Sequence, residues 1–238
     1  MIGTNRDINS KDWTVLVYME GRDRLAASTE AALNKLEEVG SGDTVDIVVQ
    51  NTSVPTAKEE RELGLQKRNT VRQKIIKDSL PETVTSPVVE DLGSDVKLDQ
   101  NTLSDFLKWG MEKYPAQHYM VVIKKHGLGF AKSGENAPLS ARELGQALRD
   151  VKRETGRGVD LLSWDSCSMA GAEVAHEVSD NVEVMTGSQE DVYAHVFPYA
   201  EIVTTLSRNS DRHTAQTMGK VVVDAHRKFA RGGMQSAL

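Results

Sequence analysis

The 238-residue sequence is 39% hydrophobic and 27% charged, which is typical of a globular protein with a substantial core. Aromatic residues make up only 5%, which argues against stacking platforms for single-stranded nucleic acid, and the formal net charge of −6 has the wrong sign for binding a phosphate backbone. The start of the sequence is polar and lacks the apolar core of a secretory signal, and the apolar runs are too short to span a membrane. Together with the composition and charge, these features predict no nucleic-acid or membrane partner. The compartment stays open: the protein is secreted or periplasmic if a leader has been removed, and otherwise cytoplasmic.

Apolar runs alternate with helical patterns along the whole chain. We expect strands at 13–19, 45–50, 119–123, 159–164 and 182–186, with a less regular hairpin strand within 68–76. Helical spacing predicts helices at 28–39, 98–114, 140–151, 169–178, 199–206 and 211–230. Ser140 and Glu143 have the spacing of a capping box at the start of one of them.

Because the strands show little strict alternation, a mostly parallel sheet covered on both faces is predicted. The fold class is therefore α/β, a three-layer sandwich. No internal repeat or linker divides the sequence, so residues 1–238 are expected to form a single domain with residues 1–12 as an N-terminal extension.

Cys167 is the only cysteine, which excludes an internal disulfide and a multi-cysteine zinc site. A lone cysteine is either a small buried hydrophobe, the commoner case, or a nucleophile. No metal ligands are assigned from the sequence.

Two predicted strands end in chemically reactive residues. His126 and Gly127 follow strand 119–123, and Cys167 follows strand 159–164 directly before a predicted helix. Sites in open parallel sheets form beyond the carboxyl ends of the strands, and both a helix N-terminus and an imidazole favour the thiolate. The backbone N–H groups of Gly127 and Cys167 are candidates for an oxyanion hole. The alternative is that His126 caps a turn and Cys167 fills a helix start.

These residues resemble the clostripain-like peptidases of the caspase, gingipain and legumain clan, and the resemblance runs through almost the whole chain. The block at 165–175, Asp-Ser-Cys-Ser-Met-Ala-Gly-Ala-Glu-Val-Ala, and the His-Gly pair at 126–127 are similar to the family's catalytic motifs. Further similar segments are residues 13–21, 103–110, 114–119, 187–190 and 197–199.

The resemblance implies a caspase-like fold and a cysteine endopeptidase that hydrolyses peptides or proteins after Arg or Lys. His126 and Cys167 would form the catalytic dyad, through an acyl-enzyme. Asp165 matches the family's acidic position for a basic substrate side chain, although it could instead cap the following helix. Glu190 or Asp191 is expected to supply a second carboxylate, and His195, where some members have an acid, is expected to line the pocket.

The resemblance leaves further points as expectations. Many relatives cleave themselves between the histidine and the cysteine, and Lys132 is the candidate site here; the default interpretation is a solvated loop lysine, and the charged run 58–72 is an alternative site for a nick. The sequence requires no cofactor. Parts of the family require calcium, but no calcium-binding loop is recognisable in this sequence. Residues 235–238 resemble the start of a family strand that normally continues. The chain is therefore expected to be either shortened at this end or an unusually small member of the family. Its oligomeric state, monomer or dimer, stays open.

Two rival interpretations follow from the same residues. The first is a catalytically inactive caspase-like fold that acts as a regulatory or interaction module. The second is a flavodoxin-like or phosphate-binding domain, but no Gly-rich phosphate loop follows any predicted strand, and Gly-Leu-Gly at 127–129 falls short of one.

Overall fold

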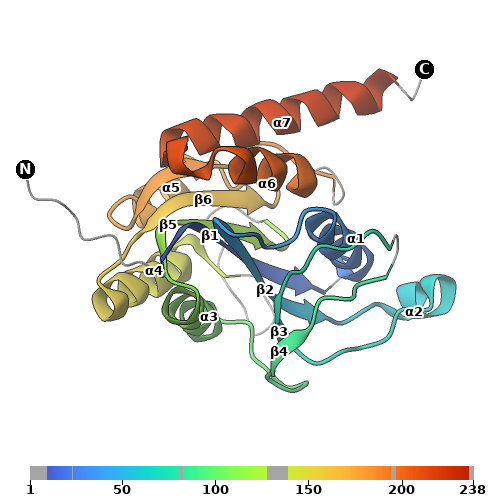
Figure 1. Ribbon diagram of the computed structural model, residues 1–238. Coiled ribbons are helices and arrows are strands. Elements are labelled where there is room, and N and C mark those ends of the chain that lie inside the picture. The colour runs from blue at the N-terminus through green and yellow to red at the C-terminus, as the bar shows by residue number, and fades with distance from the viewer. Residues whose placement is uncertain (1–9, 23, 81–82, 128–138, 194–196, 236–238) are drawn as a thin grey trace, which may run out of the picture.

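The computed structural model describes residues 10–22, 24–80, 83–127, 139–193 and 197–235, with side chains up to residue 229. A seven-stranded sheet in the order β4-β3-β2-β1-β5-β6-β7 forms its centre (Figure 1). The parallel strands are β1 (Lys11–Gly21), β2 (Val45–Ser53), β5 (Ala116–Lys124), β6 (Val159–Asp165) and β7 (Val182–Thr186). At one edge, β3 (Val71–Lys74) and β4 (Val88–Asp91) continue the sheet with antiparallel pairing.

Helices cover both faces of this sheet, as Figure 1 shows most plainly for α3 and α4 on one side and α6 and α7 on the other. One face packs on α3 (Gln100–Lys113), α4 (Ala141–Thr155) and α5 (Ala172–Val178). The other packs on α1 (Ala26–Glu37), α6 (Tyr199–Arg208) and α7 (Ala215–Gln235). The predicted three-layer α/β sandwich with a mostly parallel sheet is therefore confirmed. In the described part of the chain, no helix is long and apolar enough to cross a membrane.

The central strand β1 explains why strict alternation is missing from the sequence. Leu16 and Tyr18 pack into the core on the α3 and α4 side, and Val15 and Val17 pack into the core on the α1 side. Since both faces are buried, successive residues are all apolar. Gly110 of α3 lets this helix approach closely, because a Cβ there would lie 2.4 Å from a methyl group of Leu16.

Several boundaries differ from the prediction. The helix expected from residue 169 begins at Ala172, with Gly171 as its N-cap, and the helix expected from residue 211 begins at Ala215 after a short 3-10 helix at Ser210–Arg212. The helix α2 (Ala57–Leu63) and strand β4 were not predicted. Helix α7 runs to Gln235, so the strand expected to start there is wrong at that residue, and residues 236–238 lie outside the described part.

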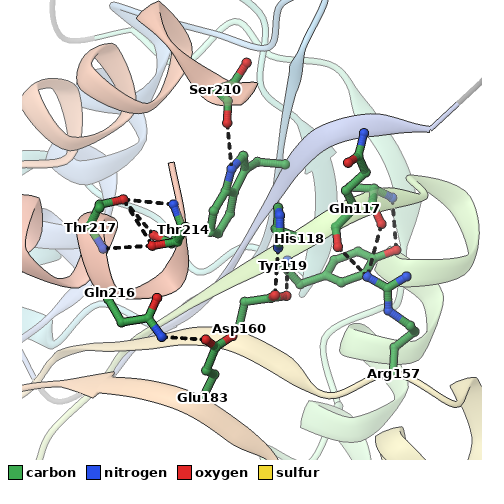
Figure 2. Close-up of polar contacts among 12 residues, drawn as sticks. Gln117, His118, Tyr119, Arg157, Asp160, Glu183, Ser210, Thr214, Gln216 and Thr217 are labelled. Atoms are coloured by element: carbon green, nitrogen blue, oxygen red, sulfur yellow. Dashed lines mark hydrogen bonds and ion pairs between the residues drawn. The ribbon is translucent and has the colours of Figure 1, made fainter. Parts of the chain in front are cut away.

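Polar contacts hold together the amino ends of the strands (Figure 2). Asp160, the second residue of β6, lies 2.8 Å from the Nδ1 atom of His118 and accepts a hydrogen bond from the backbone N–H of Tyr119. The Trp13 ring packs 4.8 Å from the His118 ring, centroid to centroid, and its Nε1 donates to the carbonyl oxygen of Ser210. This edge is a structural junction of β1, β5 and β6, at the opposite end of β6 from Cys167.

Candidate active site

The carboxyl ends of β5 and β6 bring the two candidate catalytic residues to one edge of the sheet. The strands are adjacent and parallel, with Lys124 paired to Asp165 in the register. His126 and Cys167 each come two residues after these partners. The predicted adjacency of the two strands is therefore confirmed.

Beyond the strands, the two loops lie in direct contact. A Cβ built on Gly127 would lie 1.7 Å from the carbonyl oxygen and 2.7 Å from the backbone nitrogen of Cys167. The backbone N–H of Lys125 also donates to Ser166 Oγ at 3.3 Å. The loop that carries His126 is thus held against the loop that carries Cys167. His126 is exposed and Cys167 is partly exposed, so the thiol is not sealed inside the core.

A third segment completes the surroundings of the thiol. The backbone N–H of Val192 donates to Cys167 Sγ at 3.3 Å, and the sulfur lies 3.5 Å from the Val192 carbonyl oxygen. The backbone N–H of Ser168 donates to the carbonyl oxygen of Glu190. Residues 190–192 therefore run beside the cysteine loop, and an N–H directed at the sulfur can stabilise negative charge on it.

The turn after the cysteine corrects two sequence-based interpretations. Ser168 has a φ of 53°, in the left-handed region that non-glycine residues rarely adopt, and α5 begins only at Ala172. Cys167 is therefore not at a helix N-terminus, so the expected activation by the helix is wrong. Because the N-cap of α5 is Gly171, the alternative in which Asp165 caps that helix is wrong too.

Asp165 is buried under the catalytic loops in an ion pair that sequence reasoning missed. Lys124 Nζ lies 2.9 Å from Asp165 Oδ2, and the side chains are only 2% and 3% exposed. The Tyr199 hydroxyl donates to the same oxygen at 2.8 Å. Burial raises the pKa of Tyr199 well above its usual value, and the neighbouring carboxylate raises it further, so this hydroxyl keeps its proton. The signal in the sequence was a lysine directly after the apolar run at 119–123.

The remaining predicted site residues are distributed as follows. Glu190 and Asp191 are exposed on the segment that contacts the cysteine loop. His195 and the expected self-cleavage residue Lys132 lie outside the described residues. Within the described ranges, no group of three His, Cys, Asp or Glu side chains is arranged to hold a metal ion, and no residues are assigned to calcium.

The central sheet, its two helix layers and the neighbouring strand ends that carry a histidine and a cysteine define a caspase-like fold. The chain belongs to the clostripain family, whose sequence model matches residues 1–235. No curated protein matches it.

Solved structures of C11 cysteine proteases share this fold. A secreted protease from Bacteroides thetaiotaomicron, in complex with an irreversible peptide inhibitor, is 20% identical with a TM-score of 0.70, over 92% of this chain and 59% of that one. An inactive zymogen from Parabacteroides distasonis is 17% identical with a TM-score of 0.64, over 89% of this chain and 64% of that one. The chain thus spans less than two thirds of the length of either.

Proposed function

We propose that this chain is a cysteine endopeptidase in which Cys167 is the nucleophile and His126 the general base and acid. The observation that carries the proposal is the backbone contact between Gly127 and Cys167 at the adjacent carboxyl ends of β5 and β6. Membership of the clostripain family supports the same chemistry.

In the proposed reaction, His126 takes the thiol proton and Cys167 Sγ attacks the carbonyl carbon of the scissile peptide bond. The C–N bond then breaks, His126 gives the proton to the leaving amine, and a thioester remains. Water activated by His126 hydrolyses the thioester and releases the thiol. The backbone N–H groups of Gly127 and Cys167 are the proposed donors to the oxyanion.

We propose peptides and proteins as substrates, cleaved after Arg or Lys. The peptide inhibitor bound to the similar Bacteroides protease supports the peptide class. The preference for a cationic side chain is supported by two exposed acidic residues beside the cysteine loop: Glu190 and Asp191 lie on the segment whose backbone contacts Cys167 and Ser168. A carboxylate pairs strongly with guanidinium or ammonium groups.

The test of the dyad is active-site labelling combined with kinetics. A chloromethyl ketone or epoxide peptide ending in Arg or Lys is expected to modify Cys167, as mapped by mass spectrometry. His126→Ala should lower kcat/KM by roughly 10²- to 10⁴-fold, because a positioned general base contributes about that much. His176→Ala, which changes an exposed histidine of α5, is the matched control and should label and turn over like the wild type.

Equal labelling of Cys167 in the wild type and in His126→Ala would contradict the dyad. If neither the wild type nor the control is labelled or hydrolyses any peptide, the endopeptidase proposal fails and the regulatory-module alternative takes its place.

A further inference from the structure

Lys125 is a buried lysine directly before His126 that the proposed reaction does not use. Its side chain is only 4% exposed, and its Nζ atom donates to the carbonyl oxygen of Leu139 at 2.8 Å. Leu139 is buried and directly precedes Ser140, the N-cap of α4. The ammonium group therefore joins the end of β5 to the start of α4.

The backbone of Lys125 is fixed as well. Its N–H donates at 3.3 Å to the Oγ atom of Ser166, the residue before Cys167. Two residues further on, Gly127 packs against the backbone of Cys167. His126 thus lies between two anchored residues, and a displacement of either one shifts its imidazole relative to the thiol.

A lysine at this position costs stability. Burial lowers the pKa of Lys125 to about 8, so the charged form is disfavoured in the fold, although the negative charges of Glu20 in β1 and Glu143 in the first turn of α4 act in the opposite direction. An apolar side chain, like those of residues 120–123 in the same strand, would avoid this cost. Because strongly perturbed groups are concentrated at functional sites, Lys125 is a candidate for a role in the reaction.

We infer that Lys125 is a positioning residue for the proposed catalytic histidine: its buried ammonium group ties the end of β5 to α4 and so holds His126 next to Cys167. This inference rests on the proposed peptidase function and adds a residue that acts through His126 rather than on the substrate. The charge contributes, because an ammonium group makes a stronger hydrogen bond to a carbonyl oxygen than a neutral amine does. Only the charged form is also attracted by Glu20 and Glu143.

The experiment compares kcat of the wild type and of Lys125→Met for one fluorogenic peptide. At pH 7 the wild-type kcat should be at least tenfold higher, with KM values within threefold, because misplaced reacting groups slow the chemical step without weakening binding. At pH 9.5, where Lys125 of the wild type has lost its proton, this ratio should fall below threefold. Groups that titrate in both proteins affect both kcat values and cancel in the ratio.

Lys152→Met is the matched control. Lys152 is an exposed lysine whose Nζ also donates to a backbone carbonyl oxygen, that of Asp180 at 2.6 Å, but it lies in the last turn of α4. Its kcat should equal the wild-type value at both pH values. Urea unfolding establishes that each variant is folded in the assay. If Lys125→Met does not fold, Lys125→Gln takes its place with the same expected ratios, since it also lacks a titrating group.

The inference is overturned if the ratio is below tenfold at pH 7, or if it stays above threefold at pH 9.5, as a purely structural role of the side chain would predict. Either result, with Cys167 labelled and the peptide hydrolysed by the wild type, leaves the peptidase function standing. If the wild type hydrolyses no peptide and Cys167 is not labelled, the proposed function fails, and the inference fails with it.

Discussion

Lys124 and Lys125 are consecutive residues at the end of a buried strand, yet their ammonium groups have different partners in the described part of the chain. Whereas Lys124 pairs with Asp165, Lys125 Nζ donates to the carbonyl oxygen of Leu139 at 2.8 Å. Burial lowers the pKa of Lys125 to about 8, although the negative charges of Glu20 and Glu143 act in the opposite direction. The residue directly before His126 is therefore a buried lysine whose pKa lies well below its usual value.

This pKa predicts a pH-dependent contribution to stability. Because the folded state binds the Lys125 proton less tightly, the unfolded state holds more protons between pH 8 and 10.5, and stability rises with pH across that window. Lys125→Met removes this group, so its free energy of unfolding relative to the wild type should be about 2 kcal/mol higher at pH 7 than at pH 9.5. Urea unfolding at both pH values measures the difference. Lys67→Met, at an exposed lysine, is the control. The same pH dependence of the free energy of unfolding in both variants would contradict the lowered pKa of Lys125.

At the scale of the elements, the site depends on how two strand-end loops meet. Gly127 has almost no space for a side chain, because its Cβ would overlap the Cys167 carbonyl group. The glycine thus permits the close approach that sets Cys167 next to the histidine loop. A single methyl group at this position forces one loop to move.

We expect Gly127→Ala to lower kcat/KM at least about a hundredfold, because small displacements of reacting groups are costly in catalysis. Overpacking should also cost roughly 1–3 kcal/mol in the free energy of unfolding. Peptide hydrolysis and urea unfolding provide the two measurements. In Gly42→Ala, where no atom lies within 4 Å of the added Cβ, both should stay at the wild-type value. Wild-type kinetics in Gly127→Ala would mean that the loop contact does not position Cys167.

At the scale of the whole molecule, one sheet separates two hydrophobic cores. Phe106 of α3 is fully buried in one of them, with its ring centroid 6.2 Å from those of Tyr18 and Trp109. The other core is formed by α1, α6 and α7 against the opposite face. The reactive loops at the carboxyl edge are supported from both sides by this packing.

Truncation of Phe106 tests that support. Phe106→Ala should cost roughly 3–5 kcal/mol in the free energy of unfolding, since it leaves a cavity in a packed core. Phe229→Ala, which removes a ring that is 47% exposed on α7, should cost less than about 0.5 kcal/mol. Urea unfolding gives both values, and similar losses would contradict the assignment of the core.

The parallel strands were located to within a few residues from the sequence, because a strand buried on both faces leaves a continuous apolar run. The elements that were missed bury little: β4 is an edge strand with no buried residue, and α2 buries only Glu59. Neither carries an apolar pattern. The capping box of α2, Thr56 with Glu59, was a signal in the sequence that could have located its start.

The sequence by itself determined the layered α/β fold, the family and the two loops that carry His126 and Cys167. These features depend on local patterns and on short motifs. Only the tertiary structure decided that Lys124 neutralises Asp165 and that Val192 contacts the thiol, 41 and 25 residues away along the chain. The reason is physical: such contacts exist only after strand order and register have brought distant segments together, and no local pattern of residues specifies them.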